Sequence, residues 1–248
     1  NGAMNIATVH LSTGDYTDAY GDAKAVQNDL NKATTVSGEK NGDSLAELTE
    51  KIGITNTSRA LLSADRTNDV KYKADGSLGS YDITTKFNES LDNYTVVLDK
   101  PGTVTLTPKE ITIKNTMTQQ YGSSDRIYEE ATVPEGQLVN GDSISTKDLQ
   151  FDIKSDGEYA KSLAENGSDA VTADAGTYTG ELIHTGGGIT HADGSDAYKN
   201  YKVTVEGDIV VTPAPLTITT KDVTTEYGTV KNTTSIATGL VNGDQHYA

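Results

Sequence analysis

The chain has 248 residues, no cysteine, no tryptophan and a formal net charge of −16. Without cysteine it has neither a disulfide framework nor a thiolate metal site. The negative charge argues against nucleic acids and anionic membrane surfaces, because both bind through lysine and arginine. No apolar run reaches the roughly 20 residues of a membrane helix, and residues 1–4 show no basic region, so we expect neither membrane insertion nor a signal peptide.

Short motifs recur along the chain in a fixed order. A Tyr-Gly pair is followed each time by an Asn-Gly-Asp triplet, with a period of about a hundred residues. The pairs are at 20–21, 121–122 and 227–228, and the triplets are at 41–43, 140–142 and 242–244. We therefore predict two full repeats, 1–107 and 108–212, and the N-terminal part of a third, 213–248. A repeat of this size can bury a core of its own.

The first repeat opens with period-two alternation. Ala7, Val9 and Leu11 alternate with polar residues, which predicts a half-buried strand over 6–11. Residues 16–20 are expected to form a second strand or an extended arm.

Residues 44–52 carry the only convincing helix pattern of the chain. Apolar residues recur there at i, i+3 and i+7, as on one face of a helix. Asp43 or Ser44 can cap the N-terminus of this helix, and Gly53 can end it.

The end of the first repeat predicts a hairpin. A strand is expected over 79–84, and two further apolar runs, 93–98 and 103–107, flank Asp-Lys-Pro-Gly at 99–102. Proline and glycine stand there in turn positions that suit them, so we expect the two runs to pair with each other.

The second repeat predicts a similar plan with one insertion. Strands are expected at 110–114, 149–153, 176–179, 200–205 and 209–211. A turn is expected at 206–208, and 143–148 fits a short helical turn. The inserted segment 184–194 contains three consecutive glycines, which indicates a mobile loop.

Prolines mark both junctions between repeats. Pro108 precedes the second repeat, and Pro213 and Pro215 precede the third. Proline fixes its own φ and keeps its predecessor extended, so we expect neighbouring repeats to be stiffly coupled. Residues 213–248 lack the Gly-x-Tyr and Asn-Tyr strands of the other repeats. We expect this tail either to pack on the second repeat or to exchange strands with a neighbouring molecule.

The motifs together resemble a known repeat family. Pro-Ala-Pro-Leu-Thr-Ile-Thr at 213–219, Gly-Leu-Val-Asn-Gly-Asp at 239–244, Gly-x-Tyr and Asn-Tyr are similar to the MBG repeats (Tyr-Gly-x type) of large bacterial surface adhesins and haemagglutinin-like exoproteins. The first repeat departs from the pattern at 5–11, where no proline leads the strand. The resemblance implies a mainly β chain of tandem β-grasp-like domains, each a small mixed sheet with one short helix. It also implies an extracellular place on a bacterial cell surface. Ig-like β-sandwich repeats are the alternative fold.

Four residues form the only cluster that resembles a metal site: His184, His191, Asp193 and Asp196. The spacing of the two histidines across three glycines does not match a pair on one helical face. We therefore expect no metal or other cofactor. Ca²⁺ stays open as an alternative, because Asp65 with Asp69 and Asp193 with Asp196 lie in Gly/Asn-rich turns, although no EF-hand loop is present.

The sequence favours a spacer over an enzyme. No Gly-x-Ser-x-Gly motif occurs, no histidine recurs in each repeat, and the resemblance supplies no catalytic residues. The leading hypothesis is a stiff stalk that projects the binding region of an adhesin from the cell. The alternative is that the repeats themselves bind mucin-type glycans or a host protein, with Tyr198 and Tyr201 as candidate contacts.

Overall fold

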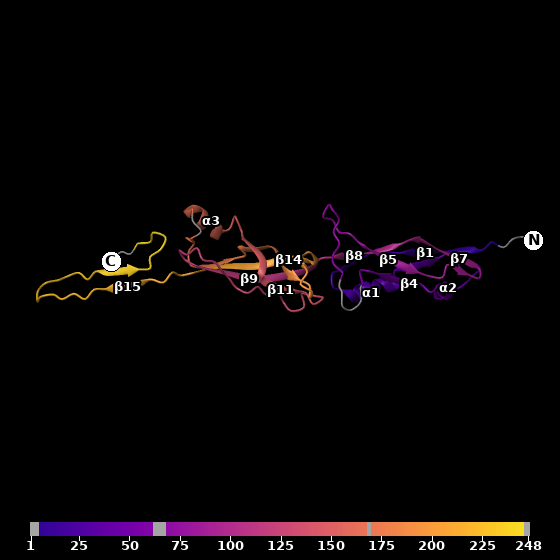
Figure 1. Ribbon diagram of the computed structural model, residues 1–248, viewed down its shortest axis with the longest axis horizontal. Helices are drawn as coiled ribbons and strands as arrows, with labels where there is room; N and C mark the ends of the chain where they lie inside the picture. The colour runs from indigo at the N-terminus through magenta and orange to yellow at the C-terminus, as the bar shows by residue number, and fades with distance from the viewer. Residues whose placement is uncertain (1–4, 62–67, 168–169, 246–248) are drawn as a thin grey trace, which may run out of the picture. The chain divides into compact units, whose positions relative to one another are not determined.

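The chain forms two compact units (Figure 1). The computed structural model describes residues 5–61, 68–167 and 170–245. Unit 1 comprises Asn1–Ile111, Gly136–Ser143 and Thr190–Lys202, and unit 2 comprises Thr112–Glu135, Ile144–Ile189 and Val203–Ala248. The chain is mainly β, as predicted. The three repeat boundaries stay a prediction, since the units follow packing, and unit 1 includes three segments of the predicted second repeat, 108–111, 136–143 and 190–202.

Unit 1 contains two four-stranded mixed sheets. The first has the order β3-β1-β7-β6 and consists of β1 (Ala7–Thr13), β3 (Thr34–Ser37), β6 (Ser90–Leu91) and β7 (Tyr94–Lys100). The second has the order β2-β8-β5-β4 and consists of β2 (Tyr16–Ala19), β4 (Thr55–Ser58), β5 (Tyr81–Lys86) and β8 (Gly102–Thr107). One parallel pair lies in each sheet, β1 with β7 and β2 with β8, and the other pairs are antiparallel.

The predicted helix of the first repeat is confirmed as α2 (Leu45–Ile52). Ser44 Oγ accepts a hydrogen bond from the Glu47 amide, and Gly53 ends the helix with a left-handed φ of 64°. Leu48 and Ile52 are buried on one face of α2, against Val9, Leu11, Tyr94 and Val96 of the first sheet. The apolar periodicity therefore places one short helix on one mixed sheet.

The prediction of a single convincing helix is wrong. Helix α1 (Ala23–Lys32) buries Val26 and Leu30, and Asp22 Oδ1 accepts a hydrogen bond from the Ala25 amide at 3.0 Å. Helix α3 (Glu158–Asn166) buries Tyr159. Both helices have few apolar residues, so their periodicity was too sparse to be recognised. The Asp22 cap of α1 was the one local signal.

The predicted hairpin at the end of the first repeat is also wrong. β7 and β8 lie in different sheets, and Pro101 stands where the chain passes from one sheet to the other. Gly102 lies so close to the backbone that a Cβ atom would come within 2.1 Å of the Gly14 carbonyl oxygen. Asp15 stabilises the chain on both sides of Pro101 and Gly102, because it accepts hydrogen bonds from the Thr103 amide at 3.1 Å and from Lys100 Nζ at 2.7 Å. Pro-Gly here marks a crossing between sheets.

The remaining strands lie wholly or largely in unit 2. One sheet has the order β10-β9-β14-β12, and two pairs are β11-β13 and β15-β16. Their bounds are β9 (Lys109–Gln120), β10 (Ile127–Tyr128), β11 (Ser143–Ile153), β12 (Gly176–Thr179), β13 (Leu182–Thr190), β14 (Tyr201–Thr212), β15 (Thr217–Thr220) and β16 (Ser235–Thr238). A 3₁₀ turn, η1 (Tyr198–Asn200), precedes β14. The core of unit 2 includes Met117, Tyr159, Leu182, Ile209 and Val211.

Three expectations for the second repeat are corrected. Residues 143–148 belong to β11 and form no helical turn. The predicted turn at 206–208 lies inside the continuous strand β14, where a Cβ atom on Gly207 would come within 2.3 Å of the Leu182 carbonyl oxygen. The glycine-rich segment 184–190 is strand β13, with positive φ at Gly187 and Gly188. In both cases glycine allows a close or irregular approach within a sheet, and the sequence pattern alone suggested a turn or loop.

Replacing Gly102 by alanine should destabilise unit 1. The added Cβ meets backbone atoms of residues 13 and 14, which cannot rotate away. We expect a loss of about 1–3 kcal/mol in the free energy of unfolding, the usual cost of overpacking. Gly176→Ala is the matched control, because its Cβ meets open space. Urea unfolding followed by circular dichroism measures the stability of both variants. Equal stability would contradict the close approach of Gly102 to residues 13 and 14.

Candidate functional site

The Asn-Gly-Asp triplets are tight turns. In all three the asparagine and glycine have positive φ: 58° and 75° at Asn41 and Gly42, 64° and 73° at the second triplet, 53° and 78° at the third. Two successive positive φ values define a type I′ turn, which favours Asn-Gly. The aspartate amide closes each turn, for example from Asp43 to the Lys40 carbonyl at 3.0 Å and from Asp142 to the Val139 carbonyl at 2.9 Å.

The tyrosine of each Asn-Tyr strand bonds to the aspartate of a triplet. Tyr94 Oη donates to Asp43 Oδ2 at 2.5 Å and accepts from the Lys40 amide at 3.0 Å. Tyr201 Oη donates to Asp142 Oδ2 at 2.7 Å and accepts from the Val139 amide at 3.1 Å. We call this arrangement the tyrosine–aspartate clasp. It joins two recurring motifs that lie more than 50 residues apart in the sequence.

At Asp142 the clasp contains a second tyrosine, Tyr20 of the first Tyr-Gly pair. Tyr20 Oη donates to Asp142 Oδ2 at 2.9 Å, and the rings of Tyr20 and Tyr201 meet edge-to-face at 5.5 Å. Tyr20 is 1% exposed and the Asp142 side chain is fully buried. Gly21 lies against Val139, so close that a Cβ atom on it would come within 2.4 Å of that side chain. Burial raises the pKa of Tyr201 far above its ordinary value, and its bond to Asp142 adds to the rise.

His191 completes the surroundings of Asp142. Its Nδ1 lies 2.8 Å from Asp142 Oδ1, and its Nε2 lies 2.8 Å from Asp69 Oδ1. Asp69 Oδ1 also accepts a hydrogen bond from Asn200 Nδ2 at 2.7 Å. Burial of the imidazole lowers its pKa, but the bonds to Asp142 and Asp69 outweigh that effect and raise the pKa overall. Both ring nitrogens are engaged by carboxylates, so the ring acts as a bridge and has no nitrogen left for a base or a metal ligand.

The residues of the expected metal cluster have separate partners. His184 belongs to unit 2, where burial lowers its pKa and its ring lies 5.8 Å from that of Phe151. In unit 1, Asp193 accepts bonds from Ser195 and Asp196 accepts one from the Tyr198 amide. Among the residues that the structure describes, no group of three or more His, Cys, Asp or Glu side chains is arranged to hold a metal ion.

Three further candidates are placed as follows. Asp65, expected with Asp69 in a calcium turn, lies outside the described residues. Tyr201, expected as a ligand contact, is 5% exposed and bonded to Asp142. Tyr198 is half-buried in η1. The geometry therefore gives Tyr201 an internal role and leaves Tyr198 as the one candidate contact with partial access to solvent.

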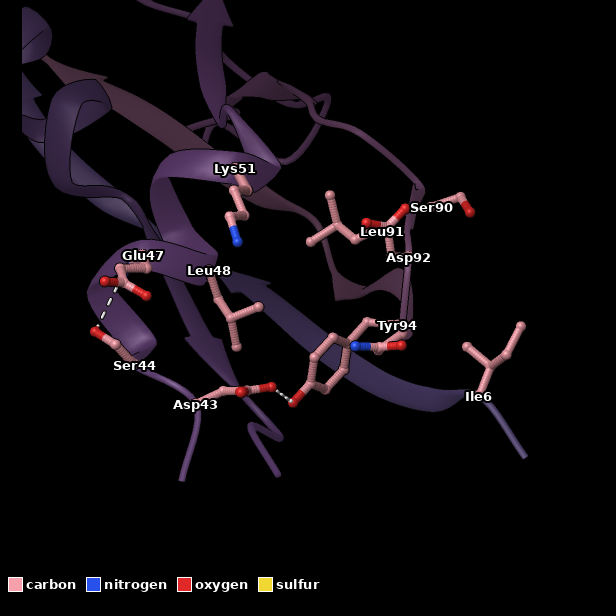
Figure 2. A pocket seen from close by; sticks show the side chains of 11 residues that line it. Ile6, Asp43, Ser44, Glu47, Leu48, Lys51, Ser90, Leu91, Asp92 and Tyr94 are labelled. Carbon is pink, nitrogen blue, oxygen red and sulfur yellow. Dashed lines mark hydrogen bonds between the residues drawn. The ribbon is translucent and has the colours of Figure 1, made fainter. Parts of the chain in front are cut away.

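The clasp at Asp43 borders an open hollow of about 610 Å³ (Figure 2). Asp43 and Tyr94 meet at its edge, Leu48 points in from α2, and Ile6 stands on the strand side. Asp43 is exposed, whereas Asp142 is buried beneath Tyr20. The two clasps thus differ in solvent exposure. The Asp142 carboxylate is buried beside Tyr20, and the Asp43 carboxylate faces solvent.

The sequence identified the motifs of this site but missed their contacts. Tyr20, Asp142 and Asp69 were not expected to act together. Recurrence of Tyr-Gly, Asn-Gly-Asp and Asn-Tyr in fixed order was the available signal, because motifs that recur together at a distance often meet in space. No such signal existed for Asp69.

Comparisons of the chain with known proteins found no match. No family model matches it, and no curated protein or solved structure matches it either. Within the described part of the chain, no helix has the length and apolar character needed to cross a membrane.

Removing the Tyr201 hydroxyl should destabilise unit 1. Tyr201→Phe leaves the buried Asp142 carboxylate and the Val139 amide each without one bond, which typically costs about 1–3 kcal/mol. The matched control is Tyr178→Phe, because its hydroxyl bonds to the Asp174 carbonyl in an exposed position. Thermal unfolding measures both variants, and an equal loss in the two would contradict the importance of the clasp.

The His191 bridge predicts a pH-dependent stability. The pKa of His191 is raised in the folded state, so its contribution is fully present below the unfolded pKa of about 6.5 and is lost as pH rises through the folded pKa. Stability of unit 1 should therefore fall as pH rises from about 6.5, and His191→Gln should remove this decline. His10→Gln on the exposed face of β1 is the control. An NMR titration that puts the pKa of His191 at or below 6.5 would contradict this assignment.

Proposed function

We propose that this chain is a structural repeat region, a spacer that holds the binding region of a bacterial cell-surface adhesin away from the cell. The observation that carries the proposal is the use made of the recurring motifs. At both clasps the repeated tyrosine and aspartate bond to each other and to the backbone of their own turn. Residues that recur in order to catalyse or bind would be expected to face a shared opening, whereas these recur to hold strands together.

The first sheet of unit 1 supports the family resemblance. It is a small mixed sheet with one short helix, α2, packed on its face. This is the arrangement that a β-grasp-like MBG repeat would have. An Ig-like sandwich, the alternative, would be expected to have only antiparallel strands, and the parallel pairing of β1 with β7 favours the first reading. An extracellular place on the bacterial surface belongs to this same proposal.

The strand order also suits a part that carries tension. β1 begins unit 1 and pairs in parallel with β7, while β2 pairs in parallel with β8, the strand that leads on to residue 109. A pull on the two ends of this stretch would slide each parallel pair along its length. The hydrogen bonds of both pairs would then share the load, whereas an antiparallel hairpin pulled at its open end breaks one bond at a time.

Single-molecule pulling on the full chain tests the spacer function. The chain has no cysteine of its own, so two introduced cysteines define the points of attachment. Attachment through Asn5→Cys and Lys109→Cys should give an unfolding force several-fold higher than attachment through Asn5→Cys and Glu39→Cys, which peels β3 from β1. Similar forces in both directions would contradict a load-bearing design.

The second candidate function, direct binding of mucin-type glycans or a host protein, rests on the open hollow beside Asp43. A glycan and mucin array with the full chain separates the two. The spacer proposal predicts no saturable binding. Saturable binding that is lost in Lys51→Ala, which lines the hollow, or in Tyr198→Ala would replace it with the binding function.

A further inference from the structure

β15 and β16 pair in the same antiparallel register as β1 and β3, although β2 and α1 lie between β1 and β3 in the chain. In β1 and β3, His10 pairs with Ser37 and Thr13 pairs with Thr34, and two pairs lie between them. In β15 and β16, Thr217 pairs with Thr238 and Thr220 pairs with Ser235, again with two pairs between. Thr217 thus corresponds to His10, and Leu216 and Ile218 correspond to Val9 and Leu11.

Two backbone features confirm this correspondence. Gly38 follows β3 with φ of 102°, and Gly239 follows β16 with φ of 99°. A Cβ atom on either glycine would clash with the carbonyl oxygen of the matching residue, Thr8 or Pro215. The two strand pairs also end with the same hydrogen bond. The Gly14 amide donates to the Ala33 carbonyl, and the Lys221 amide donates to the Thr234 carbonyl.

The partner on the other edge differs. β1 lies between β3 and the parallel strand β7, whereas β15 pairs with β16 alone in the described part of the chain. Leu216 and Ile218 are 51% and 56% exposed, whereas Val9 and Leu11 at the same positions are fully buried against β7 and α2. Within the described residues, the edge of β15 thus has the apolar side chains of an inner strand but no strand beside it.

The amides of this edge have the correct direction for a parallel neighbour. Lys221 donates its amide to β16, so by the alternation of a strand the amides of residues 214, 216 and 218 point to the opposite, open edge. Ala7 is the counterpart of Ala214, and its amide donates to the Asn93 carbonyl, next to Tyr94, at 3.1 Å. Both prolines of the segment, at 213 and 215, fall at positions whose amide would face away. The Pro-Ala-Pro pattern therefore removes no donor from the open edge.

A cavity of about 250 Å³ lies where the tyrosine of such a neighbour would enter. Ala214, Asp244 and Tyr121 all line this cavity. Ala214 corresponds to Ala7, which pairs with Tyr94. Asp244 corresponds to the clasp aspartates Asp43 and Asp142. Tyr121 corresponds to Tyr20, whose ring meets that of Tyr201 edge-to-face. Three contacts that a clasp tyrosine makes elsewhere in the chain therefore converge on one cavity.

We propose that the open edge of β15 binds, as an added parallel strand, an extended peptide segment with the pattern Asn-Tyr followed by alternating β-branched residues. Its tyrosine enters the cavity at Ala214 and donates to Asp244. Main-chain bonds to the amides of 214, 216 and 218 supply affinity, and the tyrosine supplies specificity, as in other cases of strand addition. This interaction surface does not depend on the spacer function.

A folded second copy does not offer such a segment. The Asn-Tyr strands of this chain, β7 and β14, are inner strands of their sheets, each with a neighbour on both sides. Releasing one would break its pairing on both edges. The occupant is therefore an extended segment that is unpaired before binding.

A synthetic peptide of residues 199–206, Lys-Asn-Tyr-Lys-Val-Thr-Val-Glu, tests the proposal with the full chain. We expect saturable binding by calorimetry, and new protection from hydrogen exchange at the amides of Ala214, Leu216 and Ile218. A peptide with Tyr201→Ala should bind at least tenfold more weakly. Absence of saturable binding, or protection on the β16 side at 235–238, would overturn the proposal.

Two variants of the chain make the test specific. Ala214→Pro removes an amide of the open edge, outside the four residue pairs of the hairpin, and should weaken peptide binding at least tenfold. Pro215→Ala is the matched control, because position 215 faces away from the open edge and does not line the cavity, and should bind as the unchanged chain does. Equal affinity for both variants would overturn the register. Dimers of the chain without peptide that protect the same amides would assign the edge to a second copy instead.

Discussion

The hydrogen bond from the tyrosine of an Asn-Tyr strand to the aspartate of an Asn-Gly-Asp turn is the constraint on which this structure depends. The turn alone leaves a carboxylate beside two positive-φ residues, and the strand alone brings a phenol into the interior. Each buried tyrosine hydroxyl needs a partner, because a buried hydroxyl without one is costly, and the buried carboxylate of Asp142 needs one for the same reason. The bond thereby fixes where the strand β7 or β14 begins relative to a turn more than 50 residues earlier.

The same constraint explains why the clasps differ in their surroundings. At Asp142 the carboxylate is fully buried and has three partners, the two tyrosines Tyr20 and Tyr201 and the ring of His191. At Asp43 it is exposed and borders a hollow. The Asp244 side chain lines a cavity that Tyr121 also lines, and among the described residues no tyrosine of an Asn-Tyr strand lines it. These are three states of one arrangement, and in the first two the repeated motifs bond a strand to a turn.

Much of the local structure could be predicted, since it depends on nearby residues. The alternation of β1, the cap and stop of α2 and the Asn-Gly turns all follow from propensity and backbone geometry. Helices α1 and α3 escaped prediction because their apolar faces are sparse. Gly102 and Gly207 led to wrong turn predictions for a different reason. A glycine that permits close packing inside a sheet has the same sequence signal as a glycine in a turn, and only the neighbouring strand distinguishes them.

The candidate site was predictable as a set of motifs and not as a set of contacts. Tyr201 was a candidate ligand contact under the alternative function and instead faces Asp142, because sequence gives no direction for a side chain at the start of a strand. His191 belonged to the one cluster that resembles a metal site, although no metal was expected, and it bridges two aspartates. A histidine beside acidic residues fits both roles, and the two occupied ring nitrogens decide between them.

The most direct measurement of the central claim is a double-mutant cycle on Tyr94 and Asp43. Among the described residues, no second tyrosine and no histidine bonds to the aspartate of this clasp, so Tyr94→Phe, Asp43→Asn and the double variant isolate one bond. If the clasp holds the strand to the turn, the cycle gives a coupling energy of about 1 kcal/mol or more. Additive losses, with a coupling near zero, would show that the recurring motifs are not energetically joined and would contradict the account.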